Sequence, residues 1–307
     1  MPRVIPTAGS DSLEMGDLVE ALEGGGFDPG DEDSMAEFAP HLRKLCNNRH
    51  FLGDIVIEEL KRQCAGQVAR NQYGPQVVLL HGTSRKFLIR ANFWPAAEDS
   101  VVVNSGSQPF FYAVPHDHNF SFLTVGYLGP GYWSDYYEYD YASVVGHPGE
   151  KVALRFVERS RLSPGKVMLY RRHIDVHSQL HPDALSVSLN ILATSPTTDL
   201  RDQYSFDLKR SEVRAIINPG GLATLVRLAA AAAGEEGIAL AEEVSQCHPS
   251  ERMRFAGLQA LAATRADSES RRALFEEAAA RETGLLAALA RDAALSVAEH
   301  APADTPG

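Results

Sequence analysis

Several features are scarce in this chain, and each absence excludes a class of protein. Only three cysteines, Cys46, Cys64 and Cys247, occur in 307 residues, and no two of them form a Cys-x-x-Cys motif. We therefore expect neither a disulfide framework nor a thiolate zinc cluster. No stretch approaches the roughly 18 apolar residues of a membrane span, and the first residues lack the apolar core of a secretory signal. These absences predict a cytoplasmic protein without a membrane partner.

Positive charge is also in short supply. The chain has 29 Lys and Arg against 40 Asp and Glu, which gives a formal net charge of -11. Nucleic-acid partners require a basic surface to meet their phosphates, so the balance excludes nucleic acid. With 44% hydrophobic residues, the chain is long enough to bury a full core and to form two domains.

Periodicity and composition divide the chain into three regions and a tail. We predict a helical lead-in over residues 1–68, a barrel of short strands over 69–205, an all-helical domain over 206–300 and a disordered tail over 301–307. The predicted strands are 76–81, 86–93, 100–103, 110–125, 132–141, 151–158, 165–170, 173–180 and 185–193. Turn signals such as Gly129-Pro130-Gly131 separate them. Because these strands follow one another without helices, the expected class is mainly β, a sandwich or barrel.

The most informative motif is His116-Asp117-His118, inside the run FFYAVPHDHNFSFLTV. Aromatic and β-branched residues favour a strand there, and side chains at i and i+2 of a strand share one face, about 6 to 7 Å apart. If that face lines a barrel, one strand presents two neutral nitrogen donors to one point. The alternative is a chance pair on an exposed strand.

A third donor from another strand would complete a facial metal site with open positions. A second group of histidines, His173, His177 and His181, lies in the predicted strand over 173–180 and the turn that follows it. A site of three neutral imidazoles leaves a divalent ion its full charge. Iron(II) would then have room for a chelating substrate and dioxygen, while zinc or nickel would favour oxygen-independent chemistry.

These motifs resemble those of the cupin superfamily. Pro115-His116-Asp117-His118 followed by Ser121, Gly126 and Gly129 is similar to the first cupin metal motif, and closest to the thiol dioxygenases, of which cysteine dioxygenase is the best known. The stretch SVSLNIL over 186–192 is similar to the second motif. The resemblance covers residues 10 to 195 loosely and does not reach the C-terminal helices. It implies a cupin-type double-stranded β-barrel between N-terminal helices and a C-terminal all-α domain.

Carried over to this chain, the resemblance makes His116 and His118 metal ligands and takes the third from the strand around 173–180. We expect His177, because it lies inside the extended Asp-Val-His-Ser-Gln run, with His173 and then His181 as alternatives. The segment Leu88-Ile89-Arg90-Ala91-Asn92 resembles the strand on which thiol dioxygenases hold the arginine that binds the substrate carboxylate.

The chain also departs from the family pattern. Phe122 and Leu123 stand where many cupins place a glutamate ligand, so the resemblance implies three histidines without a carboxylate. Leu123 replaces the cysteine that some thiol dioxygenases crosslink to tyrosine. Asn190 and Leu192 replace a histidine and a tyrosine further along the chain. These departures disfavour free cysteine as the substrate.

Three further side chains are candidates for catalytic roles. Arg90 lies between apolar neighbours, and a buried guanidinium needs an anion, which is either a substrate carboxylate or one of Glu138, Asp140 and Asp175. Glu138 lies in a strand of alternating acids and tyrosines. It is a candidate fourth ligand, general base or partner for a cationic group, or a solvated carboxylate. Tyr112 would supply a pocket hydroxyl, or would belong to the core.

Together these features predict a mononuclear non-haem iron oxygenase that acts with dioxygen on a small carboxylate, such as an amino acid or a derivative. The alternatives are a zinc- or nickel-dependent isomerase, lyase or hydrolase, a ligand-binding cupin without catalysis, and a structural protein without metal. The C-terminal helices would serve a partner, a lid or a homo-oligomer, and the sequence does not choose among these.

Overall fold

The chain folds into two compact units in a computed structural model that describes residues 1–71, 73–74, 76–196, 198–218 and 221–299. The first, here the β unit, comprises Met1–Tyr141, Lys151–Thr198 and Gln203–Ala215. The second, here the helical unit, comprises Ala142–Glu150, Asp199–Asp202 and the chain from Ile216 onward. The candidate metal ligands all belong to the β unit.

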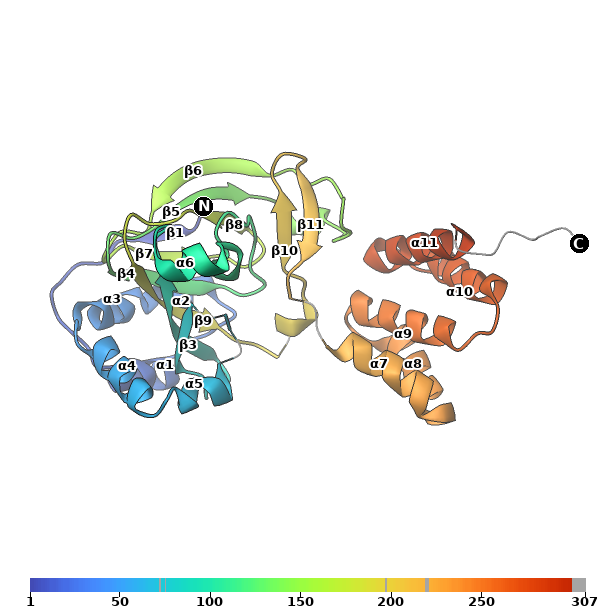
Figure 1. Ribbon diagram of the computed structural model, residues 1–307, viewed down its shortest axis with the longest axis horizontal. Coiled ribbons are helices and arrows are strands. Elements are labelled where there is room, and N and C mark those ends of the chain that lie inside the picture. The colour runs from blue at the N-terminus through green and yellow to red at the C-terminus, as the bar shows by residue number, and fades with distance from the viewer. Residues whose placement is uncertain (72, 75, 197, 219–220, 300–307) are drawn as a thin grey trace, which may run out of the picture. The chain divides into compact units, whose positions relative to one another are not determined.

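The strands of the β unit form two larger antiparallel sheets and a hairpin (Figure 1). The first sheet has the order β1-β7-β4-β9-β3-β2 and the second β6-β5-β8, while β10 and β11 pair with each other. The strands are β1 (Arg3–Ile5), β2 (Val77–His81), β3 (Phe87–Trp94), β4 (Phe122–Leu128), β5 (Trp133–Glu138), β6 (Arg155–Arg161), β7 (Val167–Tyr170), β8 (Asp175–Gln179), β9 (Ser186–Ala193), β10 (Tyr204–Asp207) and β11 (Glu212–Ile216).

Helices cover one face of the six-stranded sheet, where Figure 1 shows them in blue. They are α1 (Met15–Gly24), α2 (Glu32–Glu37), α3 (Ala39–Asn47) and α4 (Phe51–Lys61). The helix α5 (Ala65–Arg70) lies beside the edge strand β2, where the Gln67 side chain hydrogen-bonds to the backbone of Leu79, and α6 (Ser100–Ser105) follows β3. Leu18 and Leu42 from the helices pack with Leu123, Leu189 and Ile191 from the sheet, and all five are fully buried. Alternation along each strand sends these residues to the helices and their neighbours to the opposite face.

The opposite face meets the three-stranded sheet. A second apolar cluster joins Phe122, Met168, Tyr170 and Leu192 of the large sheet to Tyr136 of β5. Side chains from both sheets therefore interdigitate, as in a β-sandwich. The metal-ligand candidates lie on this inner side.

The prediction of a mainly β protein with a cupin-type double-stranded β-barrel is confirmed only in part: the described sheets are antiparallel, but they form no closed barrel and helix outweighs strand. Helical residues make up 42% of the described residues and strands 23%. Within the described residues no strand of one sheet pairs with a strand of the other, and bridges such as His116 with His177 and Gly126 with Pro164 each pair a strand with a residue outside the named strands. The cause lies in residues 95–121, which fold into α6, a short 3-10 helix and turns, and so do not continue the hydrogen-bonded ladder.

Several predicted elements also change. The run over 100–103 is the helix α6 although its valines favour strands, and the predicted strand over 110–125 becomes regular only from Phe122. The short strand β1 and the hairpin of β10 and β11 were missed. That hairpin lies at the start of the region predicted to be helical. It was missed because its few β-branched residues are outweighed in composition by the long Ala-rich segment that follows.

The helical unit contains five described helices. They are α7 (Leu222–Ala232), α8 (Gly234–Cys247), α9 (Glu251–Ala263), α10 (Ser268–Arg281) and α11 (Gly284–Glu299). Ser250 and Asp267 cap α9 and α10, since their side-chain oxygens accept the backbone N–H groups of Met253 and Ser270. The tail over 301–307 lies outside the described residues.

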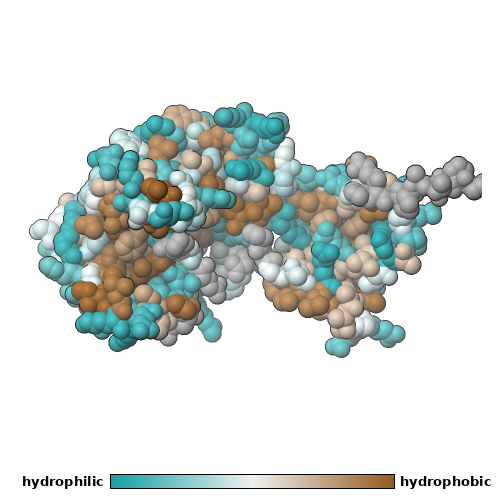
Figure 2. Space-filling view, viewed as in Figure 1, coloured by the Kyte–Doolittle hydropathy of each residue, from teal (hydrophilic) through white to brown (hydrophobic). Residues whose placement is uncertain are grey.

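Some apolar side chains remain exposed in each unit. In the β unit these include Ile57 and Leu60 on α4, and in the helical unit Leu222, Leu225 and Leu228 on α7. Figure 2 shows brown surface over both helices. Even so, none of the described helices has both the length and the apolar character that crossing a membrane demands.

The turn between β4 and β5 leads the chain from one sheet to the other and depends on glycine. Gly131 has a φ of +80°, and a Cβ there would lie 2.0 Å from the carbonyl oxygen of Leu162. We predict that Gly131→Ala lowers the free energy of unfolding of the β unit by about 2 kcal/mol or more, through strain and overpacking. Denaturant titration with tryptophan fluorescence measures this, because both tryptophans, Trp94 and Trp133, lie in that unit.

Gly106→Ala is the matched control for this substitution. Gly106 has a φ of +74° but nothing within 4 Å of an added Cβ, so it reports the backbone strain without the clash. We expect a smaller loss of about 1 kcal/mol. Equal losses in the two variants would show that the close approach to Leu162 does not matter.

Candidate metal centre

Two segments far apart in sequence are joined where the histidines meet. The N–H of His116 donates to the carbonyl of His177, and the N–H of His177 donates to the carbonyl of His116, both at 3.0 Å. Such a reciprocal pair sets two residues directly opposite each other, about 5.5 Å apart at Cα. The residues from Val114 to His118 are therefore extended but not part of a regular strand, which corrects the strand predicted there.

The structure brings His116, His118 and His177 together. One nitrogen from each lies within 4.8 Å of the others, and all three residues are buried. The Nε2 atoms of His116 and His177 are 3.2 Å apart. Two nitrogens bound to one ion at about 2.1 Å, at roughly 90 to 109°, would be about 3.0 to 3.4 Å apart, so the observed spacing suits a shared metal.

Hydrogen bonding and burial favour the neutral form of the imidazoles, in which they can act as metal ligands. His116 Nδ1 lies 2.8 Å from the carbonyl oxygen of Val114. This contact places the proton on Nδ1 and leaves the Nε2 lone pair free for a metal. Burial lowers the pKa of His116, and it lowers those of His118 and His177 well below the usual histidine value. A divalent cation is what such a set of buried neutral nitrogens fits.

Asp117, between two of the histidines, holds their segment in place. Its Oδ1 accepts the N–H of Tyr204 at 2.6 Å, and its Oδ2 accepts the hydroxyl proton of Tyr139 at 2.6 Å. Its carbonyl accepts a side-chain N–H from Gln203. Asp117 is fully buried and points away from the histidine cluster, so it orients the segment and is not a ligand.

Aromatic rings surround the cluster. His118 packs edge-on against Phe122 at 4.8 Å, and Tyr170 lies 4.9 Å from the ring of His177. The hydroxyls of Tyr136 and Tyr170 are 2.9 Å apart, and burial raises the pKa of Tyr136 to about 12. The apolar, protonated lining keeps the environment of the site weakly hydrated, which strengthens electrostatic interactions inside it.

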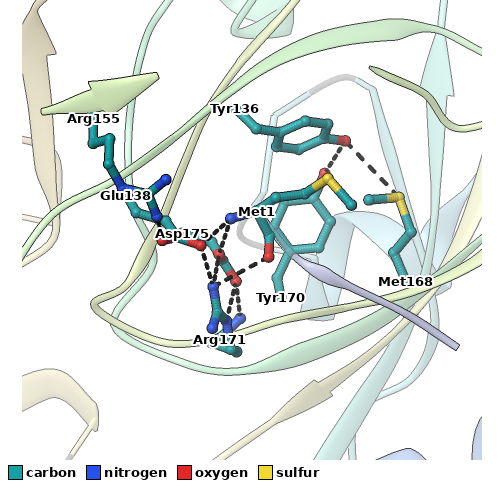
Figure 3. Close-up of polar contacts among 8 residues, drawn as sticks. All are labelled: Met1, Tyr136, Glu138, Arg155, Met168, Tyr170, Arg171 and Asp175. Carbon is teal, nitrogen blue, oxygen red and sulfur yellow. Dashed lines mark hydrogen bonds and ion pairs between the residues drawn. The ribbon is translucent and has the colours of Figure 1, made fainter. Parts of the chain in front are cut away.

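Glu138, predicted as a catalytic group, lies in an ion-pair network. Figure 3 shows it with Arg155, Arg171, Asp175 and the amino group of Met1. Burial raises the pKa of Glu138, but hydrogen bonds from the amino group and Arg171 outweigh this and lower it to about 2. A carboxylate so strongly paired is a poor general base at neutral pH.

Tyr112 and Arg90 occupy different surroundings. The hydroxyl of Tyr112 donates to the carbonyl of Pro95 at 2.8 Å, so its one proton is already engaged. Arg90 lies over the ring of Tyr73, 4.6 Å from its centroid, and its Nε is buried without a hydrogen-bond partner. The ion pairs of Glu138 and Asp175 do not include Arg90.

Arg90 also lies close enough to the histidines for its charge to help lower the pKa of His116 and His118, after the larger effect of burial. Burial lowers its own pKa as well. A guanidinium with an open donor beside a metal site is suited to an anionic ligand.

The remaining histidines lie outside the cluster. His173 has a φ of +59°, its ring packs at a tilt against Tyr141, and its Nδ1 lies 3.6 Å from Asp117. His181 contacts the hydroxyl of Ser107 at 2.9 Å. Sequence reasoning missed Gln179, whose side chain reaches the cluster. The available signal was its position two residues after His177 on one strand.

Comparisons with known proteins do not identify a family. No family model and no curated protein matches the chain. One of the solved structures it resembles is a hydroquinone 1,2-dioxygenase, PnpCD, in complex with Cd2+ and 4-hydroxybenzonitrile. The match is 12% identical, covers 42% of this chain and 71% of that chain, and has a TM-score of 0.25. A likeness at that level carries no argument about this protein.

The cluster predicts a dependence of metal content on single histidines. We expect His118→Ala to lower bound metal at least tenfold, because it removes one donor of three. Elemental analysis of purified protein measures this. His181→Ala is the matched control and should keep the wild-type metal content, since His181 pairs with Ser107. An unchanged metal content in His118→Ala would show that the three histidines do not form a metal site.

The buried histidines also predict how the metal-free protein responds to acid. Their pKa values are lower in the folded protein than the unfolded value of about 6.5, so below that pH the unfolded chain binds more protons. As the pH falls below about 6.5, the free energy of unfolding should decrease by up to about 1.4 kcal/mol per pH unit for each histidine. His118→Ala should show a shallower slope in denaturant titrations between about pH 6.5 and 5. Equal slopes would contradict the account.

Proposed function

We propose that the protein is a mononuclear non-haem iron(II) oxygenase of the cupin type that acts on a small carboxylate-bearing substrate, such as an amino acid or a derivative. The observation that carries the proposal is the meeting of His116, His118 and His177 beside the unpaired donor of Arg90. Three neutral histidines on one side of an ion leave positions open on the other. Bound iron(II) would supply the site for dioxygen and substrate.

The chain's own residues would divide the remaining tasks. Arg90 would bind the substrate carboxylate and so fix its orientation. The carbonyl of Val114 would keep the proton of His116 on Nδ1 throughout. Phe122 and Tyr170 would keep water away from the reacting groups. Glu138 and Tyr112, whose polar groups are already paired, would support the structure around the site.

Oxygen consumption tests the proposal. Iron-loaded protein is screened with amino acids and related small carboxylates in an oxygen electrode, and zinc- and nickel-loaded protein are assayed in parallel for anaerobic turnover. Oxygen uptake that requires both iron and a carboxylate is the expected result. Turnover that ignores oxygen would replace the proposal with a zinc or nickel isomerase, lyase or hydrolase, and binding without turnover would replace it with a ligand-binding protein.

Arg90 provides a second test. Arg90→Ala should raise the KM for the substrate about 10- to 100-fold, the effect of losing a charged hydrogen bond of about 1.5 to 3 kcal/mol, and should leave the metal content unchanged. Arg155→Ala is the control, because Arg155 is an exposed arginine that pairs with Glu138. Loss of metal in Arg90→Ala would instead make Arg90 a support of the histidine cluster.

A further inference from the structure

Gln179 places a carboxamide against the histidine cluster. It follows His177 by two residues on β8, so the two side chains share a face of the strand. Gln179 is buried, and its Nε2 is 3.1 Å from Nε2 of His177. Its backbone is fixed on two sides, because it pairs with Ser134 of β5 and its carbonyl accepts the N–H of Ala113 at 2.9 Å.

This nitrogen-to-nitrogen contact conflicts with metal binding. A hydrogen bond from Gln179 to His177 Nε2 would use the lone pair that a ligand nitrogen needs. The other end of the same amide, Oε1, is buried without a hydrogen-bond partner. A half-turn of the amide exchanges its nitrogen and oxygen in nearly the same space, and the two are told apart only by their hydrogen bonds. That exchange would set an oxygen beside the cluster and release the lone pair.

We propose that Gln179 is a fourth protein donor to the metal, through its carboxamide oxygen. The inference rests on the proposed three-histidine metal site and deepens it. The near end of the amide lies 3.1 Å from His177 Nε2, and His116 Nε2 lies 3.2 Å from the same atom. Both separations match the roughly 3.0 to 3.4 Å expected between neighbouring ligands of one ion.

The fourth donor has chemical consequences. An amide oxygen is neutral, so the ion keeps the full charge that three imidazoles leave it, which a glutamate would reduce. It also reduces the positions open to exogenous ligands in a six-coordinate site from three to two. A ligand that binds through two atoms would then either fill the site or displace Gln179.

Cobalt binding tests the inference without any substrate. Metal-free wild-type protein is titrated with Co2+, whose visible absorption is stronger at low coordination number, and the dissociation constant and band intensity are recorded. The variants are Gln179→Leu, which removes the donor, and Gln179→Glu, which returns an oxygen. Asn92→Leu is the control, because it makes the same amide-to-leucine change at another buried position on β3. Thermal unfolding of each metal-free variant reports its folding.

We expect Gln179→Leu to raise the Co2+ dissociation constant about 10- to 100-fold and to intensify the visible bands. Gln179→Glu should bind at least as tightly as wild type, and Asn92→Leu should stay within about threefold of it, well below the effect of losing a ligand. Wild-type affinity and spectrum in Gln179→Leu would overturn the fourth donor alone. If the wild-type protein binds no Co2+, the three-histidine site and the fourth donor both fail.

Discussion

The reciprocal backbone hydrogen bonds between His116 and His177 are the constraint on which the site depends. They join a segment without regular secondary structure to β8, and they set two imidazoles opposite each other across that junction. The carboxylate of Asp117 fixes the other side of the segment, because it accepts hydrogen bonds from Tyr204 and Tyr139. Because the backbone carries this geometry, the ligands are positioned before any metal binds, and little ordering remains for the ion to impose.

Burial of the site determines which chemistry this geometry can support. Two sheets enclose the three histidines with aromatic side chains, and the same burial that lowers the histidine pKa values keeps the imidazoles neutral. The Nδ1 atoms of His118 and His177 are buried without a hydrogen-bond partner, and burying such nitrogens unpaired costs free energy. Arg90 adds an unpaired donor to the same side of the fold. A cation held by the histidines and an anion held by Arg90 would satisfy both.

Much of the site could be predicted from sequence, and less of the fold. His-x-His spacing is local, so His116 and His118 were accessible, and His177 followed from its extended run. The sequence did not reveal that the strands would form no closed barrel. The segment that becomes α6 is rich in valines, which favour strands, and only its tertiary context makes it a helix. Glu138 looked available because its partners, Arg171 and the first residue, are distant in sequence. Nothing in the sequence indicated Gln179 except its position two residues after His177, which places both side chains on one face of the strand.

The central claim, a metal held by three histidines with open positions, is tested most directly by elemental analysis of protein purified without oxygen, followed by addition of nitric oxide and electron spin resonance. The account predicts about one iron per chain and an iron-nitrosyl signal, which requires an open coordination position. Protein that holds no iron, zinc or nickel after growth with these metals, or iron that gives no nitrosyl signal, would contradict it.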